Sequence, residues 1–263
     1  MDAVNKTLYI PLFGKAAVSQ KGIIIKDPKA EEIWKKEGFT LRGKAKSRWL
    51  TYYMAMRARV FDEWTKKQLQ RYPEAIVLHI GCGMDSRVER INAPERIWYD
   101  IDYPSVIQER KHYFEESGNY RMLSADASDI KWINGLENGK EAIVIMEGIS
   151  MYLTNGEIGS LFLALQNQFT RVLLLMDCYT VFGAKASRFK NPVNDVGAKI
   201  VSGIDHPEAF EQNEGIHFTR ELDMTPSELI DELSTFEQTF FKLMFAGKTA
   251  KKIYRLYEYK INK

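Results

Sequence analysis

The feature that most constrains the fold of this chain is a series of short apolar runs between residues 75 and 177. Segments with helical spacing of apolar residues, such as PSVIQERKHYFEES and TNGEIGSLFLALQNQF, separate five runs: AIVLHI, RIWYDI, YRMLSA, AIVIME and RVLLLMD. Continuous apolar runs of this length that alternate with helices are typical of parallel strands buried on both faces. The pattern therefore predicts a doubly wound α/β sheet.

The chain that precedes these runs is expected to be helical. DPKAEEIWKKEGF begins with an N-cap residue, Asp27, followed by a proline, and residues 47–69 carry apolar side chains at helical spacing over several turns. We expect residues 1–72 to form an N-terminal helical cap and residues 73–263 to form the core. Since 263 residues with 45% hydrophobic composition can bury a sizeable core, the two parts are expected to make one structural domain, 1–263.

The strand pattern is lost after Asp177. Residues 180–225 are too many for a plain connection in a compact domain, so we expect an insert of helices and loops over the site. TPSELIDEL then has the threonine and early proline of a helix start. Two late apolar runs, FEQTFFKLMF and KIYRLYEYKI, are joined by AGKTAK without a helix, which predicts an antiparallel pair of strands.

Composition and charge exclude several classes of protein. The formal net charge of +2 is too small to indicate a nucleic-acid partner. MDAVNKTLYIPLF has no basic segment before its apolar residues, and no apolar stretch is long enough to span a bilayer, so a cytoplasmic protein without a membrane partner is expected. The two cysteines, Cys82 and Cys178, are too few for a disulfide framework and wrongly spaced for zinc, and we predict no metal site.

Two glycines lie in the turn that leaves the first predicted strand, in VLHIGCGMDSRVERI. In doubly wound sheets ligands bind at the carboxyl ends of the strands, where a glycine lets the backbone approach the ligand closely. Gly81 and Gly83 match the first part of a dinucleotide fingerprint, but its third glycine is replaced by Ser86. This departure weakens the case for a nicotinamide-dependent reductase, which stays open as an alternative.

Acidic residues follow the next three predicted strands. RIWYDIDYP contains Asp100 and Asp102, about twenty residues after the glycines, where a carboxylate can accept hydrogen bonds from ribose hydroxyls; either can serve, and Asp102 at the strand end is better placed. Asp126 can accept a hydrogen bond from an adenine amine beside the small Ala127, or it can cap the next segment. Glu147 needs a cationic partner, either a ligand or a structural salt bridge.

Four segments, in their order and spacing, resemble the leucine carboxyl methyltransferase family: IGCGMDSRVERI, WYDIDYP, SADASDI and MEGISMYLT. The resemblance is greatest to the bacterial branch described as tetracenomycin polyketide-synthesis O-methyltransferase-like. It extends upstream to MRARVFDEW and YIPLFGKA and is loose only between residues 180 and 225. The resemblance implies a class I methyltransferase that uses S-adenosylmethionine, with a seven-stranded Rossmann-like sheet whose last strand is antiparallel.

The resemblance also implies which residues surround the methyl donor. They are Gly81 and Gly83 beside the methionyl part, Asp102 at the ribose, Asp126 and Ala127 at the adenine, and Glu147 near the methionine portion. The resemblance also implies that Arg59 reaches the donor carboxylate or the acceptor. Neighbouring Arg57 is another candidate for this role. Alternatively, Arg59 is a surface residue that pairs with Asp62 or Glu63. Tyr152 is a second candidate for orienting the acceptor, or it packs beneath the following helix.

The chemistry of methyl transfer bears on the acceptor. A sulfonium is already activated, so a carboxylate acceptor, which is ionised at neutral pH, needs no general base, whereas a phenol usually does. The four histidines are His79, His112, His206 and His217, and none is assigned as a base. We expect O-methylation of a small, possibly polyketide-like acceptor, with a carboxylate preferred to a hydroxyl and a small molecule preferred to a protein C-terminus.

Two further expectations concern the state of the protein. We expect a monomer or a homodimer. A catalytically silent donor-binding module is a third functional alternative, but it would be expected to have lost some of the charges at Asp102, Asp126 and Glu147.

Overall fold

A seven-stranded sheet forms the centre of the computed structural model, which describes residues 8–38, 47–190 and 202–263. The strand order is β3-β2-β1-β4-β5-β7-β6. The strands are β1 Ile76–Ile80, β2 Trp98–Asp102, β3 Tyr120–Ser124, β4 Glu141–Met146, β5 Arg171–Tyr179, β6 Ile216–Leu222 and β7 Tyr254–Asn262. Strands β1 to β5 are parallel, and β7 pairs antiparallel with both β5 and β6, which confirms the predicted sheet and its antiparallel last strand.

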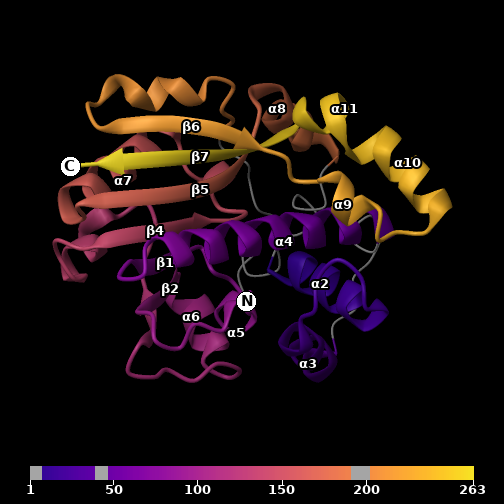
Figure 1. Cartoon of the computed structure of the whole chain (residues 1–263), viewed down its shortest axis with the longest axis horizontal. Coiled ribbons are helices and arrows are strands. Elements are labelled where there is room, and N and C mark those ends of the chain that lie inside the picture. The colour runs from indigo at the N-terminus through magenta and orange to yellow at the C-terminus, as the bar shows by residue number, and fades with distance from the viewer. Residues whose placement is uncertain (1–7, 39–46, 191–201) are drawn as a thin grey trace.

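Helices cover both faces of this sheet (Figure 1). Before the sheet come α2 Tyr9–Lys21, α3 Pro28–Glu37 and α4 Arg48–Arg71; between the strands lie α5 Arg87–Ile91, α6 Pro104–Arg110 and α7 Asn155–Gln168; after β5 come α8 Val181–Lys190, α9 Ser227–Ile230, α10 Thr235–Phe245 and α11 Gly247–Lys251. Three 3-10 helices are η2 Ile130–Gly135, η3 Ser150–Tyr152 and η5 Pro207–Gln212. Asp27 caps α3 as predicted, since its side chain accepts a hydrogen bond from the backbone of Ala30.

The core has two layers because the side chains of each buried strand alternate between the two faces of the sheet. Val77 of β1 packs with Phe61 and Trp64 of α4 on one face. Leu78 of β1 lies on the other face, in the cluster that contains Phe162 of α7. The long helix α4 therefore belongs to the core of the sheet, although the division into cap and core at residue 72 stays a prediction.

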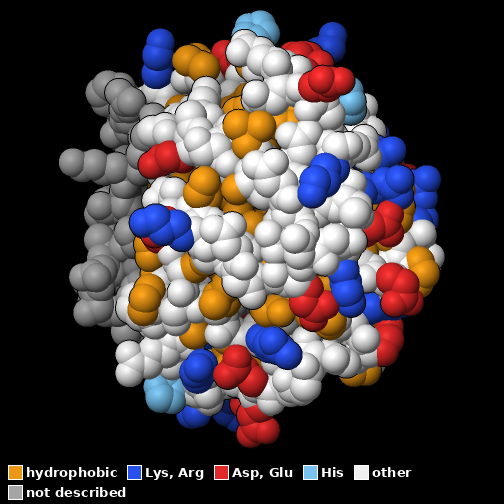
Figure 2. All heavy atoms as spheres, turned by 90° about the vertical axis from the view of Figure 1, so that its left-hand side faces the viewer, with side chains coloured by type: hydrophobic (Ala, Val, Ile, Leu, Met, Phe, Trp, Pro, Cys, Tyr) orange, Lys and Arg blue, Asp and Glu red, His pale blue; other side chains and the backbone are white. Residues whose placement is uncertain are grey.

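The carboxyl ends of the parallel strands lie at the end of the molecule where α2 and the start of α4 are found (Figure 1). Figure 2 shows the opposite end, where acidic and basic side chains are intermixed and hydrophobic side chains form only small groups. Among the described residues, no helix has the length and apolar character needed to cross a membrane.

The C-terminal prediction needs a correction. The run FEQTFFKLMF is helix α10, and the joint AGKTAK contains helix α11, so this run is not the strand partner of β7. Apolar residues at positions 236, 240, 241, 244 and 245 have helical spacing, and Ser234 with Glu237 forms a capping box that begins the helix.

The actual partner, β6, lies inside the region 180–225 that was expected to hold helices and loops. Its sequence, IHFTREL, gives a weak strand signal because it is an edge strand with only Ile216 fully buried.

Helix α7 offers a direct test of the packing on its face of the sheet, where Leu78 and Phe162 lie. Leu161 is completely buried against the sheet, whereas Leu163 is 37% exposed on the outer side of the same helix. Leu161→Ala should lower the free energy of unfolding by about 2–5 kcal/mol, because it leaves a cavity. Urea unfolding measures this change, and Leu163→Ala, the control, should stay within about 0.5 kcal/mol of the wild type, as is usual for surface sites. Equal effects of the two substitutions would contradict the assigned packing.

Candidate functional site

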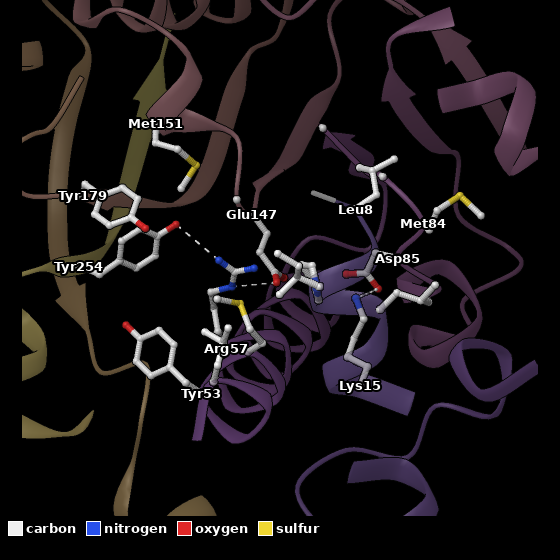
Figure 3. Close-up of a pocket in the computed structure, with 18 of the residues that line it drawn as sticks. Leu8, Lys15, Tyr53, Arg57, Met84, Asp85, Glu147, Met151, Tyr179 and Tyr254 are labelled. Atoms are coloured by element: carbon white, nitrogen blue, oxygen red, sulfur yellow. Dashed lines mark hydrogen bonds and ion pairs between the residues drawn. The ribbon is translucent and has the colours of Figure 1, made fainter. Parts of the chain in front are cut away.

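A cavity of about 330 Å³ lies beside the carboxyl ends of β1 and β4 (Figure 3). Its walls come from α2, α4, the turn after β1, the segment after β4, and the C-terminal elements around α10, α11 and β7. Figure 3 shows charged side chains of Lys15, Arg57, Asp85 and Glu147 in this region, with a group of tyrosines at another side. The cavity therefore has a charged part and an aromatic part.

The glycine turn after β1 lines the cavity. Gly81 has a φ of +71° and Gly83 a φ of +52°, values that L-residues with a side chain rarely adopt. A Cβ atom at Gly81 would lie 2.6 Å from the side chain of Ile149, and one at Gly83 would lie 2.9 Å from that of Leu8. The backbone conformation thus favours glycine at both positions, and at Gly81 the close packing against Ile149 favours it as well.

Asp102 is joined directly to this turn. Its carboxylate accepts hydrogen bonds from the backbone N–H of Gly83 at 2.8 Å and of Tyr103 at 2.7 Å. Burial raises the pKa of Asp102 despite these two donors. Each carboxylate oxygen keeps a lone pair beyond these bonds, so the group can still accept from a ligand hydroxyl.

Asp100, the other candidate, is fully buried in an ion pair with Arg110 and also accepts a hydrogen bond from Tyr120 at 2.7 Å. These partners give Asp100 a structural role in the interior. Neither Asp100 nor Asp102 is part of the cavity lining, so the choice of Asp102 rests on its contact with the glycine turn.

Asp126 and Ala127 follow β3 at the same edge of the sheet. The Asp126 carboxylate accepts hydrogen bonds from the backbone N–H and the hydroxyl of Ser128, both at 2.8 Å, which is the capping arrangement considered as the alternative. Ala127 is buried, and neither residue lines the cavity. An adenine-binding role for these two residues stays a prediction.

Glu147 lines the cavity and is held by two arginines. One carboxylate oxygen accepts from Nε of Arg57 at 3.0 Å, and the other accepts from Arg87. Burial by itself would raise the pKa of this carboxyl, but the guanidinium groups of Arg57 and Arg87 outweigh it and hold the pKa at about 2. Glu147 therefore combines the two predicted alternatives: it forms a structural salt bridge, and it also faces the cavity in which a ligand can bind.

Arg57, and not Arg59, faces the cavity. Arg57 is buried, lines the cavity, and donates to Asp177 at 2.9 Å as well as to Glu147. Two residues along an α-helix correspond to a rotation of about 200°, so the side chain of Arg59 leaves the opposite side of α4. There it pairs with Glu63 at 3.1 Å, the surface alternative, and the structure does not bring it to the predicted site.

Sequence reasoning missed several residues of the cavity. Lys15 of α2 pairs with Asp85 at 3.2 Å, and both residues line the cavity. Burial would raise the pKa of Asp85, but Arg90, Lys15 and Arg87 hold it well below its usual value. Lys15 and Asp85 lie within YIPLFGKA and IGCGMDSRVERI, two segments that carry the family resemblance. The resemblance therefore included both residues, but the sequence did not assign either of them a role.

The aromatic part of the cavity contains Tyr53, Tyr152, Tyr179 and Tyr254. Tyr152, a predicted acceptor-orienting residue, lies there at the end of η3. Among the described residues, His79 is the one histidine in the lining, and the other three histidines of the chain are exposed.

Comparison with known proteins agrees with this arrangement. Residues 9–166 match the sequence profile of the leucine carboxyl methyltransferase family. The chain belongs to this family. It is therefore an S-adenosylmethionine-dependent methyltransferase, and its parallel sheet with an antiparallel last strand is the sheet of such enzymes.

Individual relatives cover much of the chain. It is similar to the tetracenomycin polyketide synthesis O-methyltransferase TcmP of Streptomyces glaucescens, with 25% identity over 241 residues that span 90% of this chain and 89% of the relative. It is also similar to the S-adenosyl-L-methionine-dependent methyltransferase dpfgK of Gibberella zeae, with 29% identity over 186 residues, 64% of this chain and 62% of that one.

Solved structures share the fold. A DUF574 family protein from Streptomyces avermitilis superposes with a TM-score of 0.60 at 13% identity and covers 90% of both chains. Magnesium protoporphyrin IX methyltransferase from Synechocystis PCC 6803 has a TM-score of 0.50 at 11% identity, covering 90% of this chain and 94% of that one.

Arg57 and Arg59, two residues apart on α4, provide a matched test of the site. Arg57→Lys should weaken binding of S-adenosylhomocysteine about 10- to 100-fold, because a lysine cannot donate to Glu147 and Asp177 in the same forked geometry and charge-assisted hydrogen bonds contribute about 1.5–3 kcal/mol each. Arg59→Lys, two residues away, should leave the affinity unchanged within about twofold, since surface substitutions change free energies little. Isothermal titration calorimetry measures both, and the thermal midpoint of each variant checks its folding. Weaker binding by the Arg59 variant alone would reverse the assignment.

The low pKa of Glu147 predicts a pH dependence of stability. Because its pKa falls from 4.5 to about 2 on folding, the stability that the ionised group contributes is fully present above about pH 4.5 and is lost as the pH falls towards 2. The difference in free energy of unfolding between the wild type and Glu147→Gln should be constant from pH 5 to 8 and should shrink below about pH 4.5. Urea unfolding at each pH measures it, and a difference that changes between pH 7 and 5 would contradict the assigned ion pairs.

Proposed function

We propose that this methyltransferase transfers the methyl group of S-adenosylmethionine to an oxygen of a small, apolar acceptor, with a carboxylate as the preferred acceptor group. The observation that carries the proposal is the two-part cavity. A charged part, formed by Lys15, Arg57, Asp85 and Glu147, lies next to the glycine turn, and the remaining lining is largely apolar and aromatic.

The charged part suits the amino-acid portion of the donor. Glu147 offers carboxylate lone pairs to an ammonium group, and Arg57 or Lys15 offers N–H donors to a carboxylate. For the ribose contact we propose Asp102, which is joined to the glycine turn through the backbone N–H of Gly83. When bound, the donor supplies a methyl group that its sulfonium has already activated. The protein then needs to hold the acceptor in line and to exclude water.

The apolar part suits a ring system or an alkyl group. Leu50 and Met54 of α4 and Met244 and Phe245 of α10 line it together with Ile253. Burial of apolar surface contributes about 25 cal/mol per Å², so a hydrophobic acceptor can be bound here without many polar contacts. The similarity over 90% of the chain to a polyketide O-methyltransferase supports a small molecule in preference to a protein C-terminus.

The tyrosines favour an acceptor that arrives already ionised. Burial raises the pKa of Tyr53 and the pKa of Tyr254 well above the ordinary value of a tyrosine, although Arg57 opposes the rise at both. Both hydroxyls therefore stay protonated, where they donate hydrogen bonds and cannot remove a proton at neutral pH.

Three further ionisable groups of the described lining, His79, Glu147 and Asp85, are also poor bases. Both ring nitrogens of His79 are engaged, by Asp100 and by Arg87, at 3.2 Å each. Glu147 and Asp85 have lowered pKa values because of their arginine and lysine partners. A carboxylate acceptor needs no base, whereas a phenol does, so the described lining supports a carboxylate.

Labelling with methyl-labelled S-adenosylmethionine tests the acceptor class. The enzyme is incubated with 2-naphthoate or with the matched phenol 2-naphthol, and separately with a cell extract divided into small-molecule and protein fractions. We expect label on the naphthoate and in the small-molecule fraction, released as volatile methanol by mild alkali, because methyl esters hydrolyse and aryl ethers do not. Alkali-stable label on the naphthol would indicate a hydroxyl acceptor, and alkali-labile label in the protein fraction would indicate a protein carboxylate, such as a C-terminus.

A further inference from the structure

A buried histidine in the lining of the cavity has no role in the function proposed above. His79 lies near the end of β1, is 1% exposed, and is among the residues that line the cavity. We propose that His79 is a positioning residue for the methyl-donor site: through Arg87 it fixes Glu147 in the orientation that receives the donor's ammonium group. The inference rests on the proposed contact between Glu147 and that ammonium group.

One side of the His79 ring is set by Asp100. The two residues are directly paired in the register of β1 and β2, and Nδ1 of His79 lies 3.2 Å from the Asp100 carboxylate. Burial would raise the pKa of Asp100, but Arg110 and the hydrogen bond with His79 hold it at about 2. An ionised carboxylate can only accept, so Nδ1 carries the proton and donates it.

The other side of the ring faces an obligatory donor. Nη1 of Arg87 lies 3.2 Å from Nε2 of His79, and a guanidinium has no acceptor atom. Nε2 therefore presents its lone pair to Arg87. The two contacts require the same tautomer, with the proton on Nδ1, so Asp100 selects the form of His79 that can hold Arg87.

Arg87 transmits this constraint to the cavity. Its side chain is completely buried, its Nε donates to Asp62 of α4 at 2.7 Å, and its Nη2 donates to Glu147. All three nitrogens of the guanidinium therefore have partners: Nε has Asp62, Nη1 has His79, and Nη2 has both Glu147 and Asp85, the latter at 3.3 Å. Because a guanidinium is planar, an acceptor at Nη1 and one at Nε fix the direction in which Nη2 points.

Glu147 needs this second arginine to keep both oxygens in place. Arg57 holds one oxygen and Arg87 holds the other, which leaves the remaining lone pairs available to a ligand in the cavity. If Arg87 loses the acceptor at Nη1, its guanidinium can tilt about the Cδ–Nε bond and shift Nη2 from Glu147 towards Asp85, so the second oxygen of Glu147 loses its fixed partner. The donor's amino-acid portion would be bound less tightly, whereas its adenosine portion would be unaffected.

Two amide substitutions separate the two ring nitrogens. His79→Asn places an amide near the position of Nδ1, where it can still donate to Asp100 but cannot reach Arg87. His79→Gln extends an amide to the position of Nε2, where its oxygen can accept from Arg87. The matched pair therefore differs in the contact that the proposal requires.

Calorimetry with two ligands tests the proposal on the whole protein. S-adenosylhomocysteine contains the amino-acid portion, and 5′-methylthioadenosine lacks it. We expect His79→Asn to weaken S-adenosylhomocysteine about tenfold, the scale of a lost charge-assisted hydrogen bond, with no change for methylthioadenosine. His79→Gln should stay within about threefold of the wild type for both ligands.

Other outcomes have distinct meanings. Unchanged affinity of the asparagine variant for S-adenosylhomocysteine, or equal weakening of both ligands, would overturn the positioning role. Failure of the wild type itself to bind S-adenosylhomocysteine would instead refute the donor site, independently of His79.

A spectroscopic measurement on the wild type does not depend on the folding of a variant. Nitrogen-15 NMR of the labelled imidazole distinguishes the two tautomers. We expect the proton of His79 on Nδ1 with a lone pair on Nε2, both with and without S-adenosylhomocysteine. A proton on Nε2 would exclude the contact with Arg87 and would overturn the proposal.

Discussion

The structure depends on the buried contact of Arg57 with Glu147 and Asp177. This guanidinium joins α4 to the segment after β4 and to β5 itself, at 3.0 and 2.9 Å. Removal of one member of a buried ion pair leaves an uncompensated charge and costs about 3–5 kcal/mol, so these three side chains depend on one another. Because Glu147 also lines the cavity, the contact that attaches α4 to the sheet shapes the binding site as well.

A second group of charges extends this attachment to the other N-terminal helices. Asp85 of the glycine turn meets Lys15 of α2 at 3.2 Å and Arg90 of α5 at 2.6 Å, and Arg90 also reaches Asp27, the cap of α3. Charges buried this deeply persist only when each has partners. The N-terminal helices are therefore part of the site, and a substitution in them is expected to change ligand binding as well as stability.

Prediction from the sequence succeeded where the signal was local. The five parallel strands were identified from their continuous apolar runs, which are buried along most of their length except in the edge strand β3. Gly81 and Gly83 were identified from their place in the turn after the first strand, and their positive φ values agree with glycine there. It failed where two local patterns were equally compatible with the residues. Phe236, Phe240 and Phe241 suit a strand by composition and a helix by spacing, and the helix is what forms, while the edge strand β6 was hidden by its exposed polar residues.

The sequence by itself determined the class of the fold, the glycine turn, the carboxylates at the strand ends and, through the order of these motifs, the family. Only the tertiary structure decided between Arg57 and Arg59, placed Asp100 in the interior beside His79, and joined Lys15 to Asp85 across 70 residues of chain. The physical reason is that turns and strands follow from neighbouring residues, whereas the partner of a buried charge depends on how separate elements pack.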